Sequence, residues 1–510
     1  MPVISRICIC LSAAAMTALM GACTTSADPS GPQPEAGAVS AWTTMADGPV
    51  QSTQDRFGDE PLSYSVSWGE LTLDPEMGAG SATISGTAYL AECDCDRAKR
   101  PVMLLFNGGP GASSSPLHFS MGPKIRGKDG AFLDNPYTIL RATDLIFIDP
   151  VDTGFSRANS QKGRDLYLGV EGDVEAVNRF IRLWLAENGR AASPIILAGQ
   201  SYGGTRLANL VAKVDDLDIR GLVMVSPALD SAAGQTDLGH VFALPTMAAT
   251  AWRFGRSSIE AENEADSWEI ARAYAEGDYL LALQEGDRLG ADEKAAAAKE
   301  IAAMTGLSAE DVQAANLRVN IQFFLEHLLA SEGLLVSRLN TGLTSALPSP
   351  DTNSHRPAAA NDPSLGLGRS NIILSEEIAA YLKQMAGVQR QDYRSLNLDA
   401  NFAWDWRASA KSPNFYVTSA PVLARFMREN EAVNLLVFAG YRDLATTLLG
   451  TQYALTHNDL PPDRVTLTAL PGGHSPYDEE TLKADIADQL FAFIESAVTA
   501  APTPSKELAE

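Results

Sequence analysis

Short apolar runs, which predict β-strands, recur along the chain. Residues 62–74 and 80–92 alternate apolar and polar positions on either side of a turn, a pattern that predicts an antiparallel hairpin. Uninterrupted apolar runs follow at 101–106, 143–149, 195–200 and 220–226, and the pattern returns at 433–439 and 464–469. Such runs are typical of strands buried on both faces of a sheet.

Helical spacing of apolar residues appears between these runs, most clearly at 173–187, and again at 481–498 after the last one. Strands that alternate with helices predict a mostly parallel sheet with right-handed crossovers. From about residue 229 to 431 the rhythm changes to Ala-, Leu- and Glu-rich helical spacing, as at 261–284 and 291–304. We therefore predict a core formed by residues 56–228 and 432–498, interrupted by a helical cap insertion at 229–431.

The two ends of the chain differ from this pattern. Arg6 precedes an apolar run that ends at Met20, and small residues follow up to Cys23, which predicts a secretory signal peptide over residues 1–23. Leu19-Met-Gly-Ala-Cys23 resembles a bacterial lipobox, in which Cys23 would be lipidated, although a plain cleaved signal is the alternative. Residues 24–55 predict a flexible linker and residues 499–510 a disordered tail. We expect an exported protein, either periplasmic or a cell-envelope lipoprotein with a lipid anchor.

Charge and cysteine content narrow the expected partners. The 510 residues include 39 Lys and Arg against 63 Asp and Glu, a net charge of −24, which repels phosphate backbones and excludes nucleic acid as an expected partner.

Cys93 and Cys95 are the only cysteines beyond the signal and the lipobox. A ring closed over one intervening residue would be strained, so we expect an exposed hairpin with reactive or loosely paired thiols. No further ligands lie nearby, and no metal site is expected.

The first candidate for chemistry is Ser201, in the sequence Gly199-Gln-Ser-Tyr-Gly203. This G-x-S-x-G pattern lies between a predicted strand and a predicted helix. Flanking glycines allow a tight, strained turn that would expose the Ser201 hydroxyl above the sheet. The bare pattern also fits a glycine-rich turn with a surface serine.

A serine hydroxyl becomes a strong nucleophile when a histidine accepts its proton and a carboxylate orients that histidine. Asp443 lies just after the predicted strand 433–439, and His474 follows the strand 464–469. Serine, then acid, then histidine is the chain order of α/β hydrolases, and the carboxyl ends of strands are where α/β sheets place their active sites. Of the six histidines, His474 fits this role best. The others are predicted to be surface or core residues: His118, His240, His327, His355 and His457.

A glycine-rich turn, Asn107-Gly-Gly-Pro-Gly-Ala-Ser-Ser114, follows an early strand. Such a turn can direct backbone N–H groups at a developing oxyanion, and the N–H of the residue after the nucleophile supplies a second donor. Gly109 and Tyr202 are therefore the predicted oxyanion donors. The fold class predicted from these features is an α/β-hydrolase fold with a mostly parallel central sheet and a large helical cap.

These motifs together resemble the serine carboxypeptidase family, specifically its bacterial branch. The resemblance also rests on Met121-Gly-Pro123, Asn135-Pro-Tyr137, Asp149-Pro-Val-Asp-Thr-Gly-Phe-Ser156, Gly440-Tyr-Arg-Asp443 and Gly473-His474. It implies an enzyme that removes C-terminal residues from peptide substrates through an acyl-enzyme, without metal or cofactor.

The sequence departs from the better-known eukaryotic members at two positions. Glutamates that help those members bind the substrate's terminal carboxylate are replaced here by Gln200 and, allowing for one deletion, Ser120. A neutral amide donates to a carboxylate at any pH, whereas a carboxyl must first be protonated. The hypothesis is that Asn107 and Gln200, beside Gly108, contact the substrate carboxylate without requiring acidic pH.

Two other functions stay open at this point. An aminopeptidase or esterase would use the same triad, since the cap sets specificity; proline iminopeptidases also have Gly-Gly-Pro-Gly, but lack the Asn-Pro-Tyr and Asp-Pro-Val-Asp-Thr-Gly-Phe-Ser stretches. A non-catalytic lipoprotein that binds peptides would need neither a triad nor an oxyanion loop. Trp404 and Trp406 fit either a substrate cleft or packing between cap and sheet.

Overall fold

A computed structural model describes residues 40–44, 50–74, 81–127, 130–347, 362–365 and 370–499, all within the unit Ala38–Glu510. The predicted signal peptide, Cys23, most of the predicted linker and residues 500–510 lie outside the described residues. Among the described helices, none has the length and apolar character needed to span a membrane.

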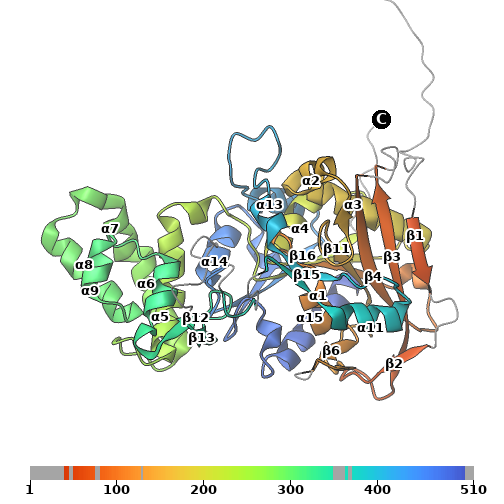
Figure 1. Cartoon of the computed structure of the whole chain (residues 1–510), viewed down its shortest axis with the longest axis horizontal. Helices are drawn as coiled ribbons and strands as arrows, with labels where there is room; N and C mark the ends of the chain where they lie inside the picture. The colour runs from red at the N-terminus through yellow and green to blue at the C-terminus, as the bar shows by residue number, and fades with distance from the viewer. Residues whose placement is uncertain are drawn as a thin grey trace, which may run out of the picture. The chain divides into compact units, whose positions relative to one another are not determined.

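The α/β-hydrolase fold is confirmed by the central sheet (Figure 1). Six neighbouring strands run parallel, in the order β8-β5-β10-β11-β16-β17. The predicted hairpin is present as β3 and β4, which pair antiparallel and join the sheet through β8. The bounds are β3 (Leu62–Leu73), β4 (Ala82–Ala91), β5 (Val102–Phe106), β8 (Asp144–Asp149), β10 (Ile195–Gln200), β11 (Ile219–Val225), β16 (Asn434–Gly440) and β17 (Val465–Leu470).

Both faces of this sheet are covered by helices, which explains the uninterrupted apolar runs. In β5, Leu104 packs in one apolar cluster and its neighbours Met103 and Leu105 pack in another, as the two-residue period of a strand requires. The first cluster includes α3 (Val170–Glu187), α4 (Tyr202–Leu210) and α13 (Ala420–Glu429). The second includes α1 (Ser115–Met121), α11 (Glu376–Ala386) and α15 (Lys483–Thr499).

The helices after β11 share a third apolar cluster, which also takes in Ala439 of β16 and Leu444 of the loop after it. They are α5 (Leu238–Arg253), α6 (Glu264–Tyr274), α7 (Leu280–Glu285), α8 (Ala291–Thr305), α9 (Ala309–Ala314) and α10 (Ile321–His327), with α6 to α9 drawn in green in Figure 1. A short hairpin of β12 (Leu334–Val336) and β13 (Thr344–Ala346) follows. We call residues 238–347 the cap.

Two parts of the chain differ from the predicted boundaries. Residues 229–431 were expected to form the insertion, but α11 and α13 within that range pack against the sheet because their apolar faces complete its two clusters. Residues 24–55 were expected to form a linker, but β1 (Ser40–Thr44) and β2 (Gln51–Thr53) pair antiparallel with β3. Strands of five and three residues are too short to show a clear hydrophobic period, so the sequence pattern did not indicate them.

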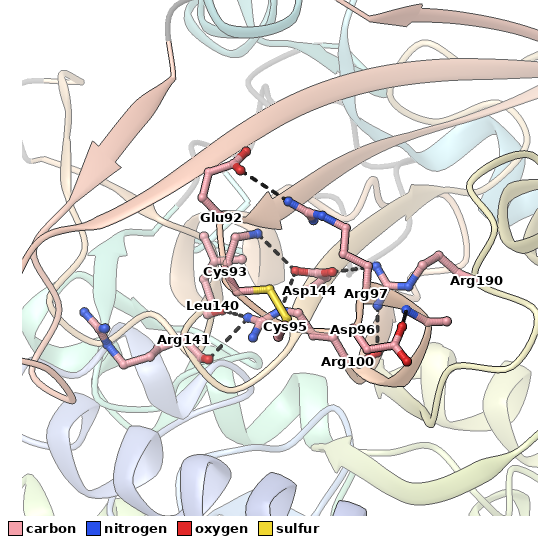
Figure 2. The surroundings of a disulfide bond; sticks show 12 residues. Glu92, Cys93, Cys95, Asp96, Arg97, Arg100, Leu140, Arg141, Asp144 and Arg190 are labelled. Carbon is pink, nitrogen blue, oxygen red and sulfur yellow. Dashed lines mark hydrogen bonds and ion pairs between the residues drawn. A yellow bond between two sulfur atoms is a disulfide. The ribbon is translucent and has the colours of Figure 1, made fainter.

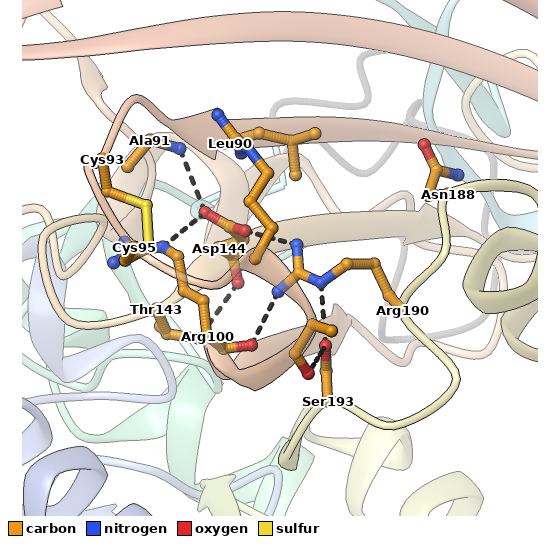
Figure 3. A network of polar contacts seen from close by, with 12 residues as sticks. Leu90, Ala91, Cys93, Cys95, Arg100, Thr143, Asp144, Asn188, Arg190 and Ser193 are labelled. Atoms are coloured by element: carbon orange, nitrogen blue, oxygen red, sulfur yellow. Dashed lines mark hydrogen bonds and ion pairs between the residues drawn. A yellow bond between two sulfur atoms is a disulfide. The ribbon is translucent and has the colours of Figure 1, made fainter.

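Reactive or loosely paired thiols were expected, but Cys93 and Cys95 form a disulfide in the loop after β4 (Figure 2). Their Cα atoms lie 5.3 Å apart, within the usual range for a disulfide, so the intervening residue does not prevent the bond. The same loop leads to Arg100, which donates to the buried Asp144 at 2.8 Å (Figure 3). Arg190 donates to the second oxygen of that carboxylate at 2.6 Å, which anchors the loop at the amino end of β8.

Candidate active site

Ser201 occupies the turn between β10 and α4. Its φ of 61° and ψ of −127° are rare for a non-glycine residue and are typical of a strained strand-to-helix turn. The flanking glycines are required by space, because a Cβ added at Gly199 would lie 2.3 Å from the Gly203 carbonyl oxygen. A Cβ at Gly203 would lie 2.7 Å from the Phe106 oxygen. The sequence prediction of a tight turn here is confirmed.

The structure brings Asp443 and His474 together. Asp443 lies in the loop after β16 (residues 441–446, the acid loop), and His474 lies in the loop after β17 (residues 471–479, the histidine loop). The Nδ1 atom of His474 is 2.7 Å from Oδ2 of Asp443. With the proton on Nδ1 donated to the carboxylate, Nε2 is the ring nitrogen that can accept a proton.

Asp443 is fully buried, and both of its carboxylate oxygens accept hydrogen bonds. The backbone N–H groups of Ala445 and Thr446 donate to Oδ1 at 2.7 and 3.0 Å. The Thr446 hydroxyl lies 2.7 Å from Oδ2 and 2.9 Å from the Ser226 carbonyl oxygen, and it can donate to either of them. It also lies 3.1 Å from Nδ1 of His474. Thr446 was missed by sequence reasoning, because a threonine three residues after an aspartate has no motif of its own.

Ser201 is linked to the histidine loop through its neighbour Gln200. Gln200 is buried, and its Nε2 donates to the His474 carbonyl and to the Ser475 hydroxyl, each at 2.9 Å. Its Oε1 accepts from Asn107 Nδ2 and from the Tyr477 hydroxyl. Both ends of the amide are thus engaged, and the link brings the end of β10 to the end of β17. Contact of Asn107 and Gln200 with a substrate carboxylate stays a prediction.

The glycine-rich loop lies directly against the start of α4. A Cβ added at Gly108 would be 2.4 Å from the Tyr202 backbone nitrogen, so only glycine permits this approach. Gly109 has φ of +100° and precedes a cis proline. The structure therefore places Gly108 directly against the Tyr202 amide, which follows Ser201. The role of Gly109 and Tyr202 as oxyanion donors stays a prediction, as does contact of Gly108 with substrate.

The segment around residues 394–406 supports this loop from the other side. Asn397 donates its backbone N–H to the Gly111 carbonyl at 2.7 Å, and Asn401 Nδ2 donates to the Pro110 carbonyl at 3.1 Å. The rings of Trp404 and Trp406 lie 5.2 and 5.7 Å from that of Tyr202, centroid to centroid. The two tryptophans thus pack around the residue after Ser201. These contacts join segments about 200 residues or more apart, so no local sequence pattern could have indicated them.

Each of the other described histidines has a hydrogen-bonding partner of its own. His118 is buried, its ring lies 2.6 Å from the Tyr89 hydroxyl, and burial lowers its pKa to about 3. His240, His327 and His457 each place Nδ1 within 3.1 Å of a backbone carbonyl oxygen. His355 lies outside the described residues. Within the described ranges, no group of three or more His, Cys, Asp or Glu side chains is arranged to hold a metal ion.

Comparison with known proteins bears on the family resemblance. Residues 89–223 match the serine carboxypeptidase family. The resemblance to that family is confirmed. The chain is 28% identical to serine carboxypeptidase-like 28 of Arabidopsis thaliana over 41% of its length and 45% of that protein. It is 38% identical to carboxypeptidase Y of Saccharomyces cerevisiae over 21% of each chain. The alignments thus span less than half the length of these curated relatives.

One solved structure supports the fold over a longer range. The crystal structure of a prohormone-processing carboxypeptidase from Saccharomyces cerevisiae aligns with a TM-score of 0.51. The alignment covers 88% of this chain and 95% of that one, at 14% identity. At this identity the match shows a shared fold. Placement in a bacterial branch stays a prediction.

Proposed function

We propose that this protein is a serine carboxypeptidase that hydrolyses C-terminal peptide bonds through an acyl-enzyme. The observation that carries the proposal is the 2.7 Å contact between His474 and the buried Asp443, together with the 2.9 Å hydrogen bond from Gln200, the neighbour of Ser201, to the His474 carbonyl. The family match supports the choice of a peptidase among the hydrolases that share this fold.

In the proposed reaction, the Ser201 hydroxyl attacks the carbonyl of the last peptide bond, and its proton moves to Nε2 of His474. The imidazolium is stabilised by Asp443 and then donates that proton to the departing amino acid. A water molecule deacylates the enzyme by the same route, with His474 again as the base. His474 then passes the proton taken from that water to the Ser201 oxygen, which regenerates Ser201 and releases the shortened peptide with a new terminal carboxyl group.

Stabilisation of the oxyanion is assigned to the backbone N–H groups of Gly109 and Tyr202. Donors fixed by the backbone need no reorganisation as charge develops, which is why such sites contribute strongly to rate. The Gly108 contact with the start of α4 supports this assignment, because it fixes the glycine-rich loop against the amide that follows the nucleophile.

Recognition of the substrate's free carboxylate is assigned to the amides of Asn107 and Gln200. Because Gln200 is bonded to His474 and Ser475, binding would exchange one of those contacts for a contact with substrate. An amide has no carboxyl to protonate, so we expect no activity rise confined to below about pH 5. A pH–rate profile of kcat/KM that rises only in that range would contradict the assignment.

Matched substrates test the proposed activity. The purified protein is incubated with an N-blocked dipeptide as the free acid and as its C-terminal amide, and release of the terminal residue is followed. We expect release from the free acid, little from the amide and none with Ser201→Ala. Cleavage restricted to unblocked peptides or simple esters would instead indicate an aminopeptidase or an esterase. Absence of any cleavage would favour a peptide-binding protein.

We also propose that the protein is exported and anchored by lipid at Cys23. The support is the sequence of residues 1–23 and its lipobox-like end. Expression of the wild type and of Cys23→Ser in a bacterial host, followed by separation of membrane and soluble fractions, tests this. We expect Cys23→Ser to leave the membrane fraction. Equal membrane retention of both proteins would contradict lipidation at this residue.

A further inference from the structure

The hairpin tip between β12 and β13 (residues 337–343) contacts both loops of the site. The backbone N–H of His474 donates to the Leu339 carbonyl at 2.6 Å, and that of Leu444 donates to the Arg338 carbonyl at 3.0 Å. Thr341 donates its N–H to the Arg442 carbonyl at 2.9 Å. A single cap segment therefore forms backbone hydrogen bonds to the histidine loop and to both sides of Asp443.

The acid loop also has a charged connection to the cap. Arg442, next to Asp443, donates to both oxygens of Glu264 in α6, at 2.8 and 2.6 Å. Both side chains are about nine-tenths buried. A bidentate pair of this kind fixes direction as well as distance. One turn later on α6, the ring of Trp268 lies 5.8 Å from that of Tyr441. The same side of α6 thus contacts two consecutive residues of the acid loop.

Arg442 reaches the histidine loop as well. Its Nη1 atom lies 3.5 Å from the Glu479 carboxylate, which also accepts from Asn340 of the hairpin tip at 3.4 Å. Its backbone N–H donates to the Gly472 carbonyl at 2.9 Å. Arg442 is therefore the residue at which the acid loop, the histidine loop and the cap meet.

We propose that Arg442 is a positioning residue, which holds the cap against both loops and thereby fixes Asp443 relative to His474. This inference rests on the proposed function, since it concerns the base of that reaction. The cap would then be part of the support of the triad as well as a cover for the substrate. A shift of about 1 Å in a reacting group can lower a rate by about 100-fold, so loss of this support should appear in kcat.

A matched pair of cap arginines tests the proposal. Arg318 forms a more exposed pair with Asp237 that has the same bidentate geometry, at 2.7 and 2.6 Å. Neither residue contacts the acid or histidine loop in the part of the chain that the structure describes. In the full chain, Arg442→Met should lower kcat on the blocked dipeptide by about 10- to 100-fold, with KM within about two-fold. Arg318→Met should leave both constants within about two-fold of the wild type. Arg442→Lys should recover part of kcat, because it restores the charge without the two-pronged geometry.

Equal kcat for Arg442→Met and the wild type, or equal losses for the two methionine variants, would overturn the proposal. A change in KM alone would also overturn it, because Arg442 would then act on the substrate. If Arg442→Met fails to fold, Glu264→Gln provides a milder change, which should lower kcat several-fold.

A spectroscopic readout separates this inference from the proposed function. The low-field proton resonance of His474 Nδ1–H reports its hydrogen bond to Asp443 directly. It should shift or broaden in Arg442→Met and stay unchanged in Arg318→Met, whatever the substrate. An unchanged resonance in both variants would contradict positioning by Arg442. Failure of the wild type to hydrolyse any peptide would contradict only the proposed function.

Discussion

Asp443 and Asp144 are both fully buried, and they lie at opposite ends of the parallel strands. Asp144, at the amino end of β8, receives hydrogen bonds from the guanidinium groups of Arg100 and Arg190 and from the Ala91 backbone N–H (Figure 3). Asp443, after the carboxyl end of β16, receives them from backbone N–H groups, Thr446 and His474. The same side chain with the same burial therefore has two kinds of partner.

The partners decide what each carboxylate can do. Arginine keeps its proton throughout the working pH range, so the Asp144 cluster is a fixed contact between the loop after β4, β8 and the loop before β10. An imidazole can accept a proton at its second ring nitrogen and pass it on, so the partner of Asp443 can take part in a reaction. Burial alone does not decide whether a carboxylate has a fixed partner or one that can exchange a proton.

The largest expected effect is that of removing the proton acceptor. His474→Ala should lower kcat/KM on the blocked dipeptide by about 10⁴-fold or more, as for other members of such triads. His118→Gln is the control, since His118 is buried against Tyr89 and makes no contact with Asp443. Its folded fraction should retain kcat/KM within a few-fold. Comparable losses in the two variants would show that His474 has no special role.

A change at the acid sharpens the comparison further. Asp443→Asn preserves the shape of the side chain, but its amide favours the wrong tautomer of His474, so kcat should fall by about 10³- to 10⁴-fold. Circular dichroism and the melting temperature should stay close to those of the wild type. A loss of structure that accounts for the lost rate would contradict a catalytic role.

The corresponding change at the other end of the strands should affect stability instead. Asp144→Asn leaves Arg100 and Arg190 without their carboxylate, and breaking a buried ion pair costs about 3–5 kcal/mol. Urea unfolding should show this loss, while kcat/KM of the folded enzyme stays within about two-fold. A large fall in kcat/KM would erase the distinction between the two aspartates.

The smallest expected effect is at Thr446. Thr446→Val removes the hydroxyl that lies between Asp443, His474 and the Ser226 carbonyl, and with it a hydrogen-bond free energy of about 1–2 kcal/mol. Because His474 would be less well oriented, we expect the activation free energy to rise by that amount, which lowers kcat about ten-fold. Thr446→Ser keeps the hydroxyl and should retain most of the rate. Equal rates for the two variants would show that the hydroxyl has no part in the orientation.

Local patterns in the sequence were sufficient to predict the parallel strands and the positions of Ser201, Asp443 and His474. The run 101–106 became β5, and the two loops that bear Asp443 and His474 follow strands that apolar runs had indicated. Parallel strands bring their carboxyl ends to one edge, so chain order was enough to predict the pair that the structure shows at 2.7 Å.

Features that depend on distant partners could not be predicted in this way. The edge strands β1 and β2 are defined by pairing with β3, and α11 and α13 are placed by the apolar clusters that they complete. The Glu264–Arg442 pair joins residues 178 positions apart. Nothing in the local sequence of either residue indicates the other.

Covalent labelling tests the central claim most directly. A fluorophosphonate reacts with a serine that has been activated by its neighbours, and peptide mass spectrometry locates the adduct. The account predicts one adduct, on Ser201, which forms much more slowly in Asp443→Asn and at the wild-type rate in Asp144→Asn. No adduct on the folded protein, an adduct on another serine, or equal slowing in the two variants would contradict it.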